Sequence, residues 1–154
     1  MTTGSAGATG SAKATQHPVG TAGRSWARTG FLLTAWLFVG CLFVQIFLAG
    51  LGTFAGGSNF IVHRDFGYLF GLLTIVLIVL GLIARLPRLL VGVSALLLVL
   101  FAMQSFFVLM RTDAPAIAAL HLVNGFLILL VAVWLALQAR RFVAPPLGTS
   151  PDSA

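Results

Sequence analysis

The sequence predicts an all-α integral membrane protein, built as an up-down-up-down bundle of four transmembrane helices. Of its 154 residues, 59% are hydrophobic and 8% are charged, and the mean hydropathy is +1.06, unlike an ordinary soluble domain. Four apolar stretches reach the roughly 20 residues that a membrane-spanning helix needs. Short loops favour antiparallel neighbours, with the first and third spans on one diagonal and the second and fourth on the other. The predicted spans are residues 31–51, 62–84, 89–110 and 115–137, within a transmembrane domain of residues 29–139.

The first span follows a segment, residues 1–28, that is rich in Gly, Ala, Ser and Thr and has no apolar periodicity. We expect this N-terminal tail to be disordered. Span 31–51 is too long and too late in the chain for a cleaved signal peptide, so we expect it to be retained. Residues 140–154 form a C-terminal tail, which we expect to be disordered in its proline-containing part from Ala144 onward.

The later spans begin after recognisable boundary signals. Ser58 lies at the end of the Gly52–Asn59 loop and can cap the second helix. Pro87 separates the second span from the third. Asp113 followed by Pro115 is typical of the start of a helix, here the fourth.

The charged residues flank the spans and predict the topology. The net charge is +6 and the pI is about 11.5, but the arginines do not form a patch with interleaved aromatic residues, so we expect no nucleic-acid partner. The positive-inside rule places both termini and the loop between the second and third spans in the cytoplasm, and the chain in the plasma membrane with the lipid bilayer as its surroundings. The six arginines that support this orientation are Arg24, Arg28, Arg85, Arg88, Arg140 and Arg141.

Polar residues inside the spans are few and lie at similar depth. At 1.5 Å per residue, Gln45, His63, Gln104 and His121 lie roughly 7–12 Å from the outer ends of their helices, and Asn124 lies slightly deeper. Polar side chains at membrane depth are costly unless they face the bundle interior and find partners. A layer to which every span contributes therefore indicates a shared internal site.

The two histidines of this layer predict a haem site. His63 and His121 are each followed four residues later by a glycine, Gly67 and Gly125, on the same helix face. This shared pattern hints at a pseudo-symmetry between two helix pairs. Neutral imidazole is a good iron ligand, and two opposed imidazoles give a six-coordinate low-spin haem. Together with Gly71, the two glycines would open a groove for the flat macrocycle.

The haem propionates would need cations or hydrogen-bond donors near the outer surface. Arg64 and Arg111 are suitably placed, and Gln45, Gln104 and Asn124 are neutral candidates at the same site. Each of these residues can also have a purely structural role. The arginines can anchor helix ends at lipid headgroups, and the amides can hydrogen-bond between helices.

Other readings of the same residues stay open. Gly67-x-x-x-Gly71 is a common helix-packing motif that needs no cofactor. The chain can accordingly be a cofactor-free structural or accessory subunit, or a small permease or proton path through His63, Asp65 and His121. Cys41 is the only cysteine, which excludes an intramolecular disulfide and argues against an Fe–S or zinc-thiolate site.

At the histidines the sequence resembles one half of a haem A synthase. The resemblance rests on His63-Arg64 opening the second span, on Gly67 and Tyr68 after it, and on Leu120-His121 in the fourth span. That family consists of two four-helix bundles with histidine ligands on their second and fourth helices. The chain also resembles a family of small, functionally unassigned four-span membrane proteins of actinobacteria.

The resemblance is closer to the non-catalytic bundle of haem A synthase, which holds haem b. The catalytic bundle has a glutamate one turn before the second-helix histidine, whereas this chain has Phe60 there and contains no glutamate. The resemblance therefore implies a haem b with His63 and His121 as axial ligands. We expect a non-catalytic protein for electron transfer or haem handling, served by a quinone or a redox partner protein and able to form a homo-oligomer.

Overall fold

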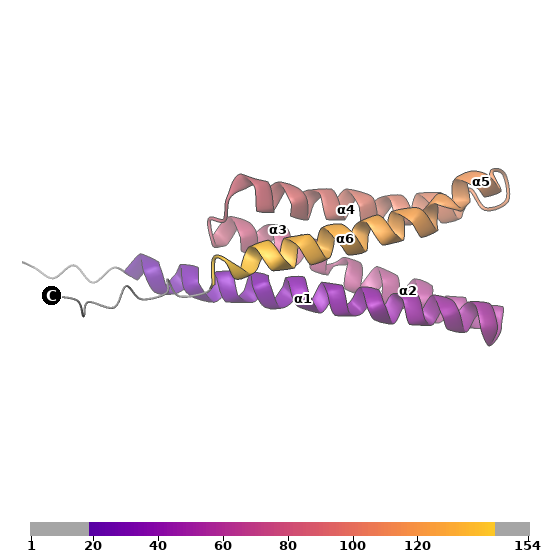
Figure 1. Ribbon diagram of the computed structural model, residues 1–154, viewed down its shortest axis with the longest axis horizontal. Helices are drawn as coiled ribbons and strands as arrows, with labels where there is room; N and C mark the ends of the chain where they lie inside the picture. The colour runs from indigo at the N-terminus through magenta and orange to yellow at the C-terminus, as the bar shows by residue number, and fades with distance from the viewer. Residues whose placement is uncertain (1–18, 144–154) are drawn as a thin grey trace, which may run out of the picture.

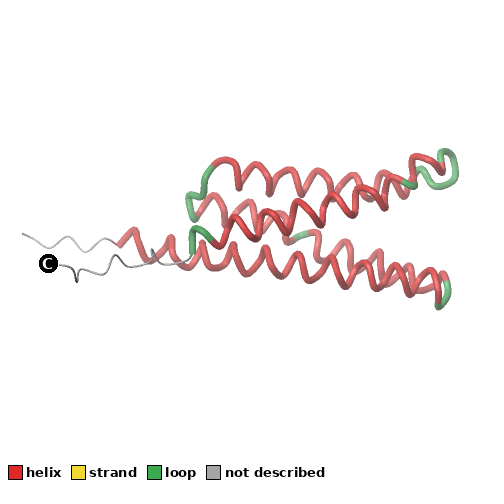
Figure 2. The backbone as a smooth tube through the Cα atoms, viewed as in Figure 1, coloured by secondary structure: helices red, strands yellow, loops and turns green. Residues whose placement is uncertain are grey.

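The computed structural model describes residues 19–143, and within them every regular element is helical (Figures 1 and 2). The elements in chain order are α1 (Val19–Phe54), the 3₁₀ turn η1 (Gly57–Asn59), α2 (Phe60–Gly71), α3 (Leu73–Ile83), α4 (Arg88–Leu109), α5 (Pro115–Ala118) and α6 (Leu120–Arg140).

These elements form four membrane-length helical segments, as predicted. The segments Arg24–Phe54, Gly57–Ile83, Arg88–Leu109 and Pro115–Arg140 are each long and apolar enough to cross a bilayer. Large apolar side chains such as Leu33 and Leu130 are more than 60% exposed on their outer surfaces. Such a surface suits lipid and not water, so the chain is a multi-pass membrane protein with an all-α four-helix fold.

The first helix begins earlier than the sequence indicates. α1 starts at Val19, so residues 19–28 of the predicted disordered tail are helical. Tertiary packing explains the difference, because Ala27 is fully buried in the core although no apolar periodicity precedes it. The remainder of that tail, residues 1–18, and the C-terminal residues 144–154 lie outside the described residues.

The cap prediction at the second span is wrong. The residue that precedes α2 is Asn59 and not Ser58, and neither residue makes a side-chain cap hydrogen bond. The turn η1 runs directly into α2, so backbone carbonyls take up the first N–H groups of the helix. At the fourth span, Pro115 does occupy the first turn of α5, but Ala114 takes the cap position expected for Asp113.

Neighbouring spans pack around the bundle as short loops require. α1 packs on α2, α3 and α6, while α4 packs on α3 and α6, so spans one and three lie on one diagonal and spans two and four on the other. The best-buried large side chains fill the middle and inner part of the bundle. They are Phe31, Phe38, Leu77, Leu97, Ile128 and Leu135.

The second span is broken at Leu72, and this break opens the half of the bundle that carries α5, which is called the outer half after the predicted topology. α3 packs against both α1 and α4, whereas α2 packs mainly against α1 and reaches α4 through the Phe70–Phe101 ring contact. Figure 1 shows the pair α1 and α2 diverging from the pair α4 and α6 toward the end that carries α5. The hydroxyl of Thr74 donates to the Gly71 carbonyl at 2.7 Å, a local bond that bends helices.

Gly71 lies where the two halves meet, because the Phe101 ring rests on its backbone. A Cβ atom at Gly71 would lie 2.5 Å from Phe101 Cε1. Phe101 is itself held by Phe38 and Phe70, with ring centroids 6.1 and 5.1 Å away. These three rings come from three spans and form a tilted aromatic layer across the middle of the bundle.

We predict that Gly71→Ala destabilises the bundle. Overpacking typically costs about 1–3 kcal/mol, which outweighs the roughly 1 kcal/mol that alanine gains over glycine in a helix. Gly92→Ala is the matched control, because a Cβ there meets no atom within 4 Å. Thermal unfolding in detergent should give a lower midpoint for Gly71→Ala and an equal or higher one for Gly92→Ala. Equal midpoints in both variants would contradict the close Phe101 contact.

Candidate functional site

A cavity of about 810 Å³ lies in the outer half of the bundle, between the pair α1 and α2 and the pair α4 and α6. Its size is within the roughly 300–1,000 Å³ typical of small-molecule and cofactor sites. Most of its wall is apolar, and Phe70 and Phe101 belong to the aromatic layer that closes it below. Its polar lining consists of Gln45, Thr53, His63, Arg64, Tyr68, Gln104, Ser105, Arg111 and His121.

In the first helix pair, Gln45 of α1 and His63 of α2 are joined by reciprocal hydrogen bonds. His63 Nδ1 lies 3.1 Å from the Gln45 carbonyl oxygen, and the Gln45 carboxamide donates to the His63 carbonyl at 2.8 Å. The same carboxamide nitrogen lies 3.2 Å from His63 Nε2. Gly67 makes room for it, because a Cβ there would lie 2.9 Å from Gln45 Nε2.

The second helix pair repeats the histidine-to-carbonyl bond and the close glycine of this arrangement. His121 Nδ1 of α6 lies 3.3 Å from the carbonyl oxygen of Gln104 in α4. A Cβ at Gly125 would lie 3.2 Å from Gln104 Nε2. Each helix pair thus places a glutamine on its first helix and a histidine with a glycine four residues later on its second, which gives the shared sequence pattern a structural counterpart.

The bonds to backbone carbonyls fix which nitrogen of each histidine carries the proton. A carbonyl oxygen only accepts, so Nδ1 of His63 and of His121 must carry the proton that is donated. In a neutral imidazole the lone pair then lies on Nε2. This is the orientation in which metal-binding histidines are usually held, with the second nitrogen donating to a carbonyl.

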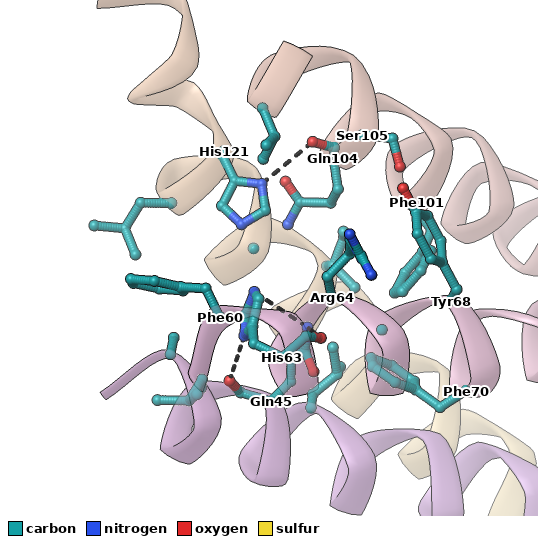
Figure 3. A pocket seen from close by; sticks show the side chains of 18 of the residues that line it. Gln45, Phe60, His63, Arg64, Tyr68, Phe70, Phe101, Gln104, Ser105 and His121 are labelled. Atoms are coloured by element: carbon teal, nitrogen blue, oxygen red, sulfur yellow. Dashed lines mark hydrogen bonds between the residues drawn. The ribbon is translucent and has the colours of Figure 1, made fainter. Parts of the chain in front are cut away.

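The two histidine rings face each other across the cavity (Figure 3). Their centroids lie 6.2 Å apart with 60° between the ring planes. Figure 3 shows His63 pointing from α2 toward His121, and His121 pointing from α6 toward His63. Residues 58 positions apart in the sequence (121 − 63 = 58) are brought together by the fold alone.

Two of the predicted binding residues lie outside the cavity lining. Gly71 is covered by the Phe101 ring, and Asn124 uses its side-chain amide to donate to the Leu100 carbonyl at 2.8 Å. Gly67 and Gly125 do line the cavity, but the space beside each glycine is taken by a glutamine carboxamide and is not the open groove expected from the sequence.

The arginines Arg64 and Arg111 both reach the cavity, and they differ in their partners. Arg64 pairs with Asp65 at 2.8 Å, the local ion pair that their adjacency suggests, and about 59% of its side chain is exposed. Arg111 is exposed and donates only a long 3.5 Å bond to the Val108 carbonyl. Asp113 accepts instead from the Thr112 hydroxyl.

Several lining residues were not anticipated from the sequence. Ser105 directly follows Gln104 and could have been found from its position at the same depth. Phe70 and Phe101 gave no such signal, because phenylalanine is common throughout the spans. Phe60 lies edge-on to the His63 ring, with centroids 6.2 Å apart.

Within residues 19–143 the structure shows no group of three or more His, Cys, Asp or Glu side chains that could hold a metal ion. His63 and His121 lie in the cavity lining as a pair. The side-chain oxygens of Gln45 and Gln104 are also buried without a hydrogen-bond partner in the described chain.

Fold and site together define a four-helix multi-pass membrane protein with two opposed histidines in a cavity within one half of its bundle. Residues 45–112 match a family of unknown function (DUF6220). This region begins at Gln45, includes His63 and Gln104, and ends before His121. No curated protein and no solved structure matches the chain.

We predict that both cavity histidines are neutral with the proton on Nδ1. Long-range ¹H–¹⁵N NMR of selectively labelled protein in detergent should give the Nδ1–H pattern for His63 and for His121. The variants His63→Gln and His121→Gln assign the signals, since each removes one of them. An Nε2–H pattern at either residue would contradict the carbonyl hydrogen bonds described above.

Proposed function

We propose that this protein binds one haem b in the cavity, with His63 and His121 as its axial ligands, and serves electron transfer or haem handling. The observation that carries the proposal is the pair of opposed imidazoles, each held by a backbone carbonyl so that its Nε2 carries the lone pair. The resemblance to the haem b-binding half of haem A synthase supports the same ligands, on the residues that match it.

The separation of the rings fits a metal between them. Imidazole nitrogens bind metals at about 2 Å, so two opposed rings sharing one metal have centroids roughly 6 Å apart. The rings of His63 and His121 already have this separation. A site with only two protein ligands suits haem in particular, because the porphyrin supplies the four equatorial ligands of the iron.

The lining of the cavity fits an apolar macrocycle with charged propionates. Apolar side chains of α1 and α6 contribute to the wall, among them Leu42, Ile46 and Phe126. Arg64 of α2 and Arg111, which follows α4, also line the cavity and would hold the propionates by charge-assisted hydrogen bonds. Arg111 is the better placed for this role, because Arg64 already shares its charge with Asp65.

The residues of this chain would bind and orient the cofactor. The carbonyls of Gln45 and Gln104 keep each imidazole in the required tautomer and orientation. The Gln45 carboxamide would have to release His63 Nε2, while its stronger 2.8 Å bond to the His63 carbonyl can remain. Bound haem supplies a one-electron redox centre, and two occupied axial positions disfavour oxygen chemistry.

A single haem in one half of the bilayer requires an electron partner. A quinone from the membrane or a redox protein at the outer surface would serve, and homo-oligomerisation would bring two haems together. We also propose a plasma-membrane location with both chain ends in the cytoplasm, on the strength of the arginine distribution. The site would then lie toward the outer face.

A cofactor-free structural subunit is the second candidate. The observation in its favour is that the Gln45–His63 and Gln104–His121 bonds already tie each helix pair together without a ligand. A permease or proton path is less well supported, because Phe70, Phe101 and Ile128 close the inner side of the cavity with apolar surface.

We predict that His63→Ala and His121→Ala each lower haem occupancy at least about tenfold, since each removes one of two iron ligands. Haem per protein is measured by the pyridine haemochrome assay on detergent-purified protein expressed with haem supply. Exogenous imidazole should restore part of the low-spin spectrum, because it can occupy the space left by the truncated side chain.

Ser105→Ala is the matched control, because it truncates a cavity residue that makes no bond to either histidine, and it should keep full occupancy. Circular dichroism and gel filtration check that the histidine variants fold. Full haem occupancy in both single histidine variants would refute the ligand assignment. A wild-type protein that folds without haem would favour the structural subunit.

A further inference from the structure

The end of the bundle opposite the cavity carries the unbalanced charge of the described chain. Arginines from three segments lie at this end. The described acidic residues, Asp65 and Asp113, both lie toward the cavity end. Figure 1 shows the start of α1, the α3–α4 turn and the end of α6 together at this end. The arginines are Arg24, Arg28, Arg85, Arg88, Arg140 and Arg141.

These arginines are placed by the core beneath them. Ala27, Ala84 and Ala139 are each at most 1% exposed and belong to one hydrophobic cluster, and each is followed directly by an arginine. In the α3–α4 turn, the Leu86 amide donates to the Gly81 carbonyl at 3.0 Å. Arg85 has a φ of 51° and is the left-handed residue that ends α3 in a Schellman motif. The fold thus directs positive charge from three segments onto one rim.

Arg28 is the member of this rim that lacks compensation. Its side chain is half-buried, and its Nε atom is buried without any hydrogen-bond partner in the described chain. No group of residues 19–143 satisfies this donor, and a buried unsatisfied donor on a charged group is costly. The outer edge of the guanidinium can bind an anion from outside the described chain, which would compensate the charge.

We propose that this rim is a binding site for the phosphate of an anionic phospholipid, with Arg28 at its centre. A lipid headgroup is the occupant that the geometry favours, because the rim lies at the end of membrane-length helices, where headgroups are found. Trp26 is 57% exposed beside it, in the position of an interfacial aromatic anchor. Guanidinium groups bind phosphate oxygens with charge-assisted hydrogen bonds.

The test is thermal unfolding of the delipidated full-length protein in mixed micelles with dioleoyl phosphatidylglycerol, dioleoyl phosphatidylcholine or inorganic phosphate. The wild type should gain stability with phosphatidylglycerol alone. Arg28→Gln should weaken the apparent phosphatidylglycerol affinity at least about tenfold, as expected for a lost hydrogen bond to a charged group. Arg28→Lys keeps the charge but lacks the planar guanidinium group and should recover only part of the affinity.

Arg24→Gln is the matched control, with the same charge change one turn farther from the core, and should weaken binding by no more than about fivefold. Equal losses of phosphatidylglycerol affinity in Arg24→Gln and Arg28→Gln would show that the lipid is attracted by the summed positive charge and not bound at a defined site. That result would overturn the proposal. Stabilisation by phosphatidylcholine or inorganic phosphate equal to that by phosphatidylglycerol would overturn it too. If Arg28→Gln does not fold, native mass spectrometry of the wild type decides, since absence of bound phosphatidylglycerol refutes the site.

Discussion

The contact between the Phe101 ring and the backbone of Gly71 is the constraint on which the rest of this structure depends. It brings α4 close to the second span at mid-membrane, and it requires a residue without a side chain at that point. Inward of the contact, α3 packs on both neighbours and the core is closed. Outward of it, α2 departs from α4, and the space between the two helix pairs becomes the cavity. One aromatic ring thus separates a packed half of the bundle from a half with a binding site.

Inside that outer half, the low dielectric of the membrane decides how polar groups are arranged. A buried imidazole must find partners, and backbone carbonyls one helix away provide them for Nδ1 of both histidines. The same bonds leave the lone pair on Nε2 of both rings, and Nε2 of His63 lies 3.2 Å from the Gln45 carboxamide nitrogen. Two opposed imidazoles with lone pairs on Nε2, together with two arginines in the cavity lining, are the physical basis for proposing haem at this site.

The fold could be predicted from the sequence to a large extent. Four apolar segments with short loops determine a bundle and its diagonals, because a polypeptide in lipid must satisfy its backbone within helices. The polar layer could also be located, since depth follows from the helical rise.

The sequence could not predict the breaks at Leu72 and Ala119, the helical start of α1 at Val19 or the burial of Gly71. They arise from contacts between distant residues, such as the Phe101 ring on Gly71, and hydrophobic periodicity does not encode them. The role of Gly67 and Gly125 was misjudged for the same reason, because only the fold shows that glutamine carboxamides occupy the space beside them.

The central claim is that Nε2 of His63 and Nε2 of His121 bind one iron together. The most direct measurement is the dithionite-reduced minus oxidised absorption spectrum of the wild-type protein, purified in detergent after expression with haem supply. Two histidine ligands predict sharp reduced α and Soret bands of a low-spin b-type haem, at one haem per chain. A folded protein without pigment, or one with the broad spectrum of a high-spin haem bound by a single histidine, would contradict the claim.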